Sequence, residues 1–176
     1  MGLDMYLSAR QYLSKYSGKK GMNKKVQKLF PEIPKDYDMG SVEVKFGIGY
    51  WRKANHIHSW FVENCQNGED DCGNYYVSRE NLEELKSNCE TALKILSEQK
   101  KIKITKKDKF TEEIYEIEIY EDTDEVRKIL PTIEGFFFGG NEIDEWYFQA
   151  LEETIKIINK CLKLSKDWSF EYHSSW

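Results

Sequence analysis

Residues 42–65 read VEVKFGIGYWRKANHIHSWFVENC and predict a strand that leads into a helix. Over 42–48, apolar residues alternate with charged residues or glycine, which is typical of a half-buried strand. Over 50–65, the apolar residues recur at helical spacing. We therefore expect a helix here, with Tyr50 and Phe61 on the face that packs into the core.

This predicted helix carries most of the polar side chains that suggest chemistry. Arg52 and His56 fall on its polar side, whereas Trp51, Asn55 and His58 form a stripe at the border of the core. The two histidines point to different sides, so they cannot hold one metal ion together. The stripe either faces a pocket or holds a border histidine that is satisfied by a backbone carbonyl.

Further strands and helices are expected along the rest of the chain. Alternation predicts strands at 3–7, 75–77, 101–105, 115–119 and 168–172, although 8–16 also fits the start of a helix. Helical spacing and capping residues predict helices at 78–96, 122–130 and 143–162. We expect an α+β fold, with a mixed or mostly antiparallel sheet packed with three to four helices.

Residues 1–176 are expected to form a single domain with two peripheral features. Residues 17–41 contain two prolines and several glycines, so we expect a flexible loop there. Residues 100–120 are expected to form a β-hairpin with one basic and one acidic strand. Antiparallel pairing of these strands places lysines opposite glutamates on the solvent face and isoleucines together on the core face.

Composition and charge restrict the class of protein. The 40% hydrophobic and 14% aromatic content excludes a disordered chain. A net charge of -5 argues against general nucleic-acid binding and against binding to a membrane surface. The N-terminus lacks the features of a signal peptide, and the apolar runs are too short to span a bilayer. We expect a cytoplasmic protein.

Signatures of the common enzyme classes are missing from the sequence. It contains no Walker loop, no GxSxG and no HExxH, and its four cysteines form no CxxC pair. We therefore assign no catalytic residue, no metal and no cofactor, and we expect binding without catalysis. An enzyme that uses His58 and Asp144 as acid and base is a further alternative.

A second segment, PTIEGFFFGG at 131–140 followed by DEWY at 144–147, is rich in aromatic residues and glycine. It is interpreted either as a buried strand with an ordinary helix start, or as an aromatic pocket wall with a carboxylate at its rim. Together the two segments give the candidate ligand-binding residues Trp51, Arg52, Lys53, Asn55, His58, Phe137, Asp144, Trp146 and Tyr147.

Six blocks of sequence together resemble a family of small proteins encoded by bacteriophages and prophages. The blocks are MGLDMYL, YWRKANHIHSWFV, DDCG, LPTIEGFFFG, DEWY and the terminal SSW. The resemblance covers most of the chain, leaving out 17–41 and 100–120. It implies a biological context, because small phage proteins commonly disarm host defences by binding a defence protein or by sequestering a nucleotide signal.

Two hypotheses follow from this context and these residues. In the first, the protein is a homodimer in the host cytoplasm that binds and sequesters a nucleotide-like immune signal. Its aromatic residues would stack on a base, Arg52 or Lys53 would bind phosphate, and Asn55 or Asp144 would contact a base edge or ribose hydroxyl. In the second, it inhibits a host defence effector, such as a CRISPR nuclease, through an acidic surface that includes 112–125.

Overall fold

The chain has an α+β fold, as the sequence predicts. The computed structural model describes residues 2–14, 22–36, 40–107, 111–133, 135 and 138–176, and within them it has five helices and six strands. The strands are β1 (Asp4–Ser14), β2 (Ser41–Arg52), β3 (Asn74–Val77), β4 (Lys101–Lys107), β5 (Ile114–Tyr120) and β6 (Ser169–Ser175). The helices are α1 (Met22–Leu29), α2 (Asn55–Cys65), α3 (Arg79–Ser97), α4 (Asp124–Ile129) and α5 (Glu145–Lys163).

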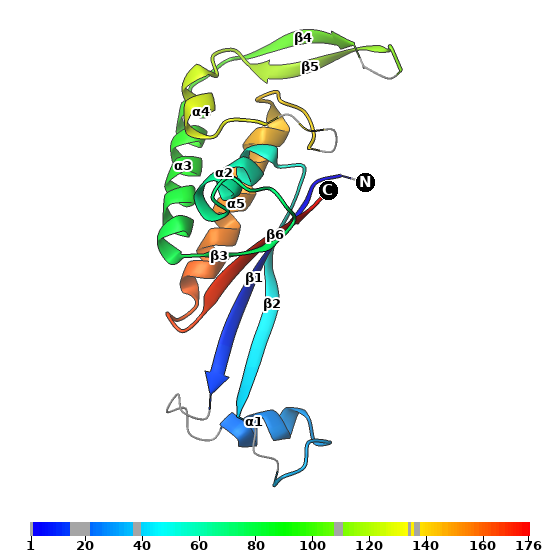
Figure 1. Cartoon of the computed structure of the whole chain (residues 1–176). Coiled ribbons are helices and arrows are strands. Elements are labelled where there is room, and N and C mark those ends of the chain that lie inside the picture. The colour runs from blue at the N-terminus through cyan, green and yellow to red at the C-terminus, as the bar shows by residue number, and fades with distance from the viewer. Residues whose placement is uncertain (1, 15–21, 37–39, 108–110, 134, 136–137) are drawn as a thin grey trace.

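Four strands form an antiparallel sheet in the order β2-β1-β6-β3, and β4 pairs with β5 in a separate hairpin. Helices α2, α3 and α5 lie on one side of the sheet, while the ribbon of β1 and β2 extends past them toward α1 (Figure 1). In the described part of the chain, no helix has the length and apolar character needed to cross a membrane.

The core lies between this sheet and the helices. Leu3, just before β1, and the alternate residues Met5, Leu7 and Ala9 along it are fully buried, which is the expected pattern for a strand with one face toward a core. On α2, the buried Phe61 ring stacks on Tyr172 of β6, with their ring centroids 4.0 Å apart. The helix is therefore anchored to the centre of the sheet.

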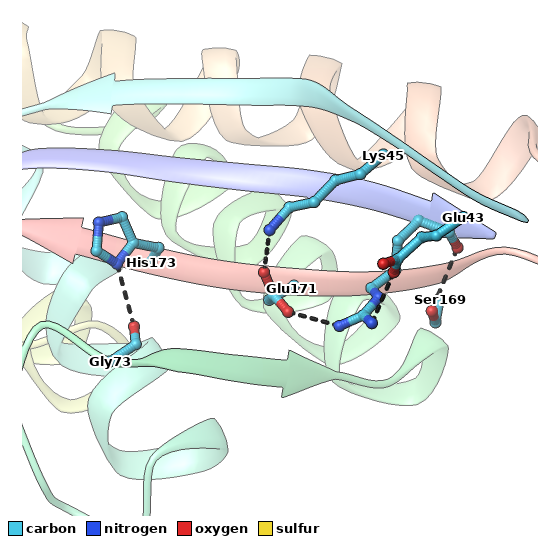
Figure 2. Close-up of polar contacts among 7 residues, drawn as sticks. Glu43, Lys45, Gly73, Ser169, Glu171 and His173 are labelled. Carbon is cyan, nitrogen blue, oxygen red and sulfur yellow. Dashed lines mark hydrogen bonds and ion pairs between the residues drawn. The ribbon is translucent and has the colours of Figure 1, made fainter. Parts of the chain in front are cut away.

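Ion pairs join three strands on the opposite face of the sheet. Arg10 of β1 contacts Glu43 of β2 at 2.6 Å and Glu171 of β6 at 2.8 Å. Lys45 of β2 also pairs with Glu171 (Figure 2). These contacts, the hydrogen bond from Lys45 foremost, lower the pKa of Glu171 below its ordinary value.

Two predicted boundaries near the central segment are wrong. β1 runs through to Ser14, paired with β2 over its whole length, so residues 8–14 of the alternative helix at 8–16 form a strand instead. The helix predicted from residue 50 begins only at Asn55, because Tyr50 and Arg52 still pair with β1. Tyr50 therefore lies on the strand and is 48% exposed, not on the core face of a helix.

Other expectations are confirmed or corrected in the peripheral elements. The hairpin is confirmed, with Lys103 opposite Glu118 and Ile102 opposite Ile119. Part of 17–41 is helical, since α1 is built mainly from residues with good helix propensity, and this helix was missed. The short helix α4 has Thr123 as N-cap without a side-chain hydrogen bond, so a capping box from Asp122 does not form.

Phe61→Ala should lower the free energy of unfolding by about 3–5 kcal/mol, because it removes a fully buried ring and leaves a cavity. Urea denaturation monitored by tryptophan fluorescence would measure the loss. The matched control is Tyr76→Ala, which truncates a side chain that is 67% exposed and should change stability by no more than about 0.5 kcal/mol. Equal losses in the two variants would contradict this description of the core.

Candidate functional site

A pocket of about 420 Å³ opens where β2 ends, α2 begins and the segment before α5 passes over both. Six of the candidate residues line it: Arg52, Lys53, Asn55, Asp144, Trp146 and Tyr147. The two sequence segments that suggested a site therefore meet in one place.

The other candidates do not line this pocket. Trp51 is buried, and its indole N–H donates to Thr154 Oγ1 of α5 at 2.9 Å, which holds strand and helix together. His58 is fully buried, with Nδ1 2.7 Å from the Tyr172 hydroxyl and Nε2 3.0 Å from an Asp70 carboxylate oxygen. The border stripe predicted for these side chains does not exist. Phe137 lies outside the described residues.

Two turns of unusual backbone meet at the rim of the pocket. Lys53 has a φ of 57°, and its N–H donates to the Leu3 carbonyl at 2.8 Å. Gly139 has a φ of 95°, and a Cβ there would lie 3.1 Å from Lys53 Cβ and 3.2 Å from the Lys53 carbonyl oxygen. Glycine is therefore required at 139, both for the backbone conformation and for the close approach.

Asn55 fixes the wall of the pocket. Its side-chain amide donates to the Gly140 carbonyl at 2.9 Å and to the Phe138 carbonyl at 3.3 Å, and the residue is buried. These bonds hold the segment at 138–140 against the start of α2. The Asn55 amide is thus used to position the wall, which differs from the direct contact with a base that the sequence suggested.

His56 also lines the pocket and was not among the candidates. It is 3% exposed, and its ring stacks on Tyr147 with centroids 3.8 Å apart. Burial lowers the pKa of His56 to about 3, so the ring is neutral near pH 7. Within the described residues, its Nε2 has no hydrogen-bond partner.

The sequence placed His56 on a polar helix face, yet α2 is buried from Asn55 through Val62. A helix that is enclosed on all sides has no polar face. The sequence indicates such burial only by the aromatic and aliphatic residues around the whole circumference of the helix.

The pocket is electrostatically suited to an anion. The first turn of α2 has no acidic residue, and its N-cap, Ala54, makes no side-chain capping bond, so the helix dipole is uncompensated there. Arg52 and Lys53 are exposed beside it. The two acids in the lining are already engaged: Glu142 pairs with Lys106, and Asp144 accepts the Tyr147 N–H at 3.0 Å as the N-cap of α5.

Comparison with known proteins finds no matching family model, no matching curated protein and no matching solved structure. The function is therefore argued from the geometry and charge of this pocket.

The buried neutral His56 makes stability depend on pH. Because its pKa is lower in the folded state than its ordinary value of 6.5, the unfolded chain takes up a proton first as the pH falls. The contribution of neutral His56 to the free energy of unfolding is complete above pH 6.5 and is lost as the pH falls toward 3. The slope of the free energy of unfolding against pH from this group is at most about 1.4 kcal/mol per pH unit.

His56→Phe keeps a ring against Tyr147 but cannot titrate, so it should remove this part of the pH dependence. The measurement is the free energy of unfolding of both proteins between pH 7 and pH 5. Parallel curves for the two proteins would show that His56 is not held neutral by burial.

Proposed function

We propose that the protein binds and sequesters a small nucleotide-like anion in the pocket at the start of α2, and acts as a phage counter-defence protein in the host cytoplasm. The observation that carries this proposal is that two cations and an uncapped helix N-terminus face aromatic residues across one cavity. A nucleotide combines the two matching features, a phosphate and a flat aromatic base.

Each part of such a ligand has a complementary group in the lining. Arg52 and Lys53 are positioned to form charge-assisted hydrogen bonds with phosphate oxygens. Trp146 is 79% exposed at the mouth of the pocket, and stacking of a base on such a ring contributes about 1–3 kcal/mol. The start of α2, whose N-cap Ala54 makes no side-chain capping bond, adds the positive end of the helix dipole.

Binding without turnover is supported by the chemistry of the lining. The described residues that line the pocket include no serine, threonine or cysteine to act as a nucleophile. His56 is a weak base, because burial lowers its pKa to about 3. His58, considered as an acid–base residue together with Asp144, is fully buried and bonded to Asp70 and Tyr172.

The alternative of an acidic surface that imitates nucleic acid receives less support. On the hairpin, Glu118 lies opposite Lys103, and Glu112 pairs with Lys107 at 3.3 Å. These lysines reduce the negative potential that a basic channel would recognise.

Arg52→Ala should weaken nucleotide binding by about 10- to 100-fold, the loss expected for a charged hydrogen bond of about 1.5–3 kcal/mol. Its melting temperature should stay close to that of the wild type, because the side chain is exposed. Titration calorimetry against a panel of cyclic and linear nucleotides measures the affinity. Lys28→Ala on α1 is the matched control and should bind normally. Absence of heat with every nucleotide would refute the proposal.

We also propose that the protein is a homodimer, and the free edge of β2 supports this. In the described sheet β2 pairs on one side only, with β1. Antiparallel pairing of two β2 strands about Val44 would set Glu43 of one copy opposite Lys45 of the other and Val42 opposite Phe46. Charged and apolar residues would thus both be matched.

Light scattering should therefore give twice the chain mass of 20.9 kDa. Val44→Lys should give the monomer mass, because it places two lysines opposite each other at the two-fold axis. Val44 is 41% exposed, so the substitution should leave the fold intact. A wild-type mass of one chain would contradict the dimer.

A further inference from the structure

The pocket adjoins a second hollow, of about 510 Å³, between β2 and α5. This second hollow, here called the β2–α5 groove, is lined on the strand side by Tyr50 and Trp51 and on the helix side by Gln149, Glu153 and Lys156. Arg52, Ala54, Trp146 and Ala150 line both cavities. A single ligand that occupied both would therefore contact Arg52 and Trp146 near its middle.

The groove results from the way strand and helix separate. At Gly49 they are in close contact, because a Cβ there would lie 2.5 Å from Ile157 Cγ2. Two residues further along β2, Trp51 is hydrogen-bonded to Thr154 of α5. β2 then ends at Arg52, and the chain turns at Lys53 into α2, so the space beside α5 continues into the pocket.

The two cavities differ in charge. The pocket carries Lys53, the uncapped start of α2 and acids that are already engaged. Beyond the shared Arg52, the β2–α5 groove is lined by Glu152, Glu153 and Lys156. Such a wall repels a phosphate, but its carboxylates and the Gln149 amide can form hydrogen bonds with a base or a ribose. The groove is thus suited to a nucleoside and the Arg52 region to a phosphate.

Size is consistent with one ring system in each cavity. Ligand cavities span about 300–1,000 Å³. Each of these two lies in the lower half of that range, and each has an exposed aromatic wall, Trp146 shared by both and Tyr50 in the groove alone.

We propose that the natural ligand is a dinucleotide, linear or cyclic, with one nucleoside in the pocket, the other in the β2–α5 groove, and a phosphodiester beside Arg52. This inference rests on the proposed function of the pocket, and it names the class of nucleotide that the site takes. A mononucleotide would fill only the pocket. It would therefore lack the contacts that the second nucleoside makes in the groove.

The test compares adenosine and guanosine monophosphates with the corresponding linear and cyclic dinucleotides in titration calorimetry on the full chain. At least one dinucleotide should bind about 30-fold or more tightly than its mononucleotide, the gain that corresponds to about 2 kcal/mol of stacking by the second base. Gln149→Trp places a large ring in the groove from an exposed position on α5, and should reduce dinucleotide affinity to the mononucleotide level without changing mononucleotide affinity. Lys160→Trp, exposed on the same helix but outside both cavities, is the control.

The outcomes separate this inference from the proposed function. Equal affinity for mononucleotides and dinucleotides would overturn the proposal that the ligand is a dinucleotide, but it would leave the pocket as a nucleotide site. Tight dinucleotide binding that Gln149→Trp does not weaken would overturn the assignment of the groove. Absence of binding by every compound would refute the proposed function itself.

Discussion

The pairing of β1 with β2 determines where the pocket lies. Their register continues until Asp4 faces Arg52, and the next N–H, that of Lys53, still donates to the Leu3 carbonyl. Only after this last bond does the chain turn and begin α2. The end of the strand ladder thus sets the position of both cations and of the helix N-terminus, and the pocket is a consequence of that register.

Because α2 is buried, several of its polar side chains need hydrogen-bond partners within the protein. Asn55 finds backbone carbonyls at 138–140, and His58 finds Tyr172 and Asp70. Asp70 in turn accepts the indole N–H of Trp176 at 3.2 Å. An unpartnered buried polar group costs about 1–3 kcal/mol, which explains why Asn55 and His58 are hydrogen-bonded; among the described residues, His56 Nε2 on the same helix has no partner.

Residues that are far apart in sequence meet through this network. Leu3 contacts the turn at Lys53, Asp70 contacts His58, and the Trp176 ring packs edge-on against Phe138, with centroids 5.8 Å apart. Residues from both ends and from the middle of the chain therefore contribute to the pocket or to the packing next to it. Their spacing in the sequence gave no sign of this arrangement, because each of these three contacts joins residues at least twelve positions apart.

Local periodicity was sufficient to predict the hairpin, α3, α5 and the α+β class. It failed at Tyr50 and Trp51, which fit both an alternating and a helical pattern, and only pairing with β1 decides between them. It also failed at His56, whose burial comes from the tertiary packing around α2. Arg52, Lys53, Asp144 and Trp146 were predictable as residues that line a pocket because they are exposed or capping residues close to the ends of regular elements.

Because the protein as a whole carries negative charge, any anion site in it depends on the local arrangement of positive groups. With a net charge of -5, the average field opposes an anion, so binding depends on groups within a few ångströms. Around the pocket, Glu142 is paired with Lys106 and Asp144 accepts the Tyr147 N–H as the N-cap of α5, while Arg52, Lys53 and the start of α2 supply the positive groups. Under the proposed function, the acids of the β2–α5 groove would keep the anion near Arg52 and leave the groove to the uncharged part of the ligand.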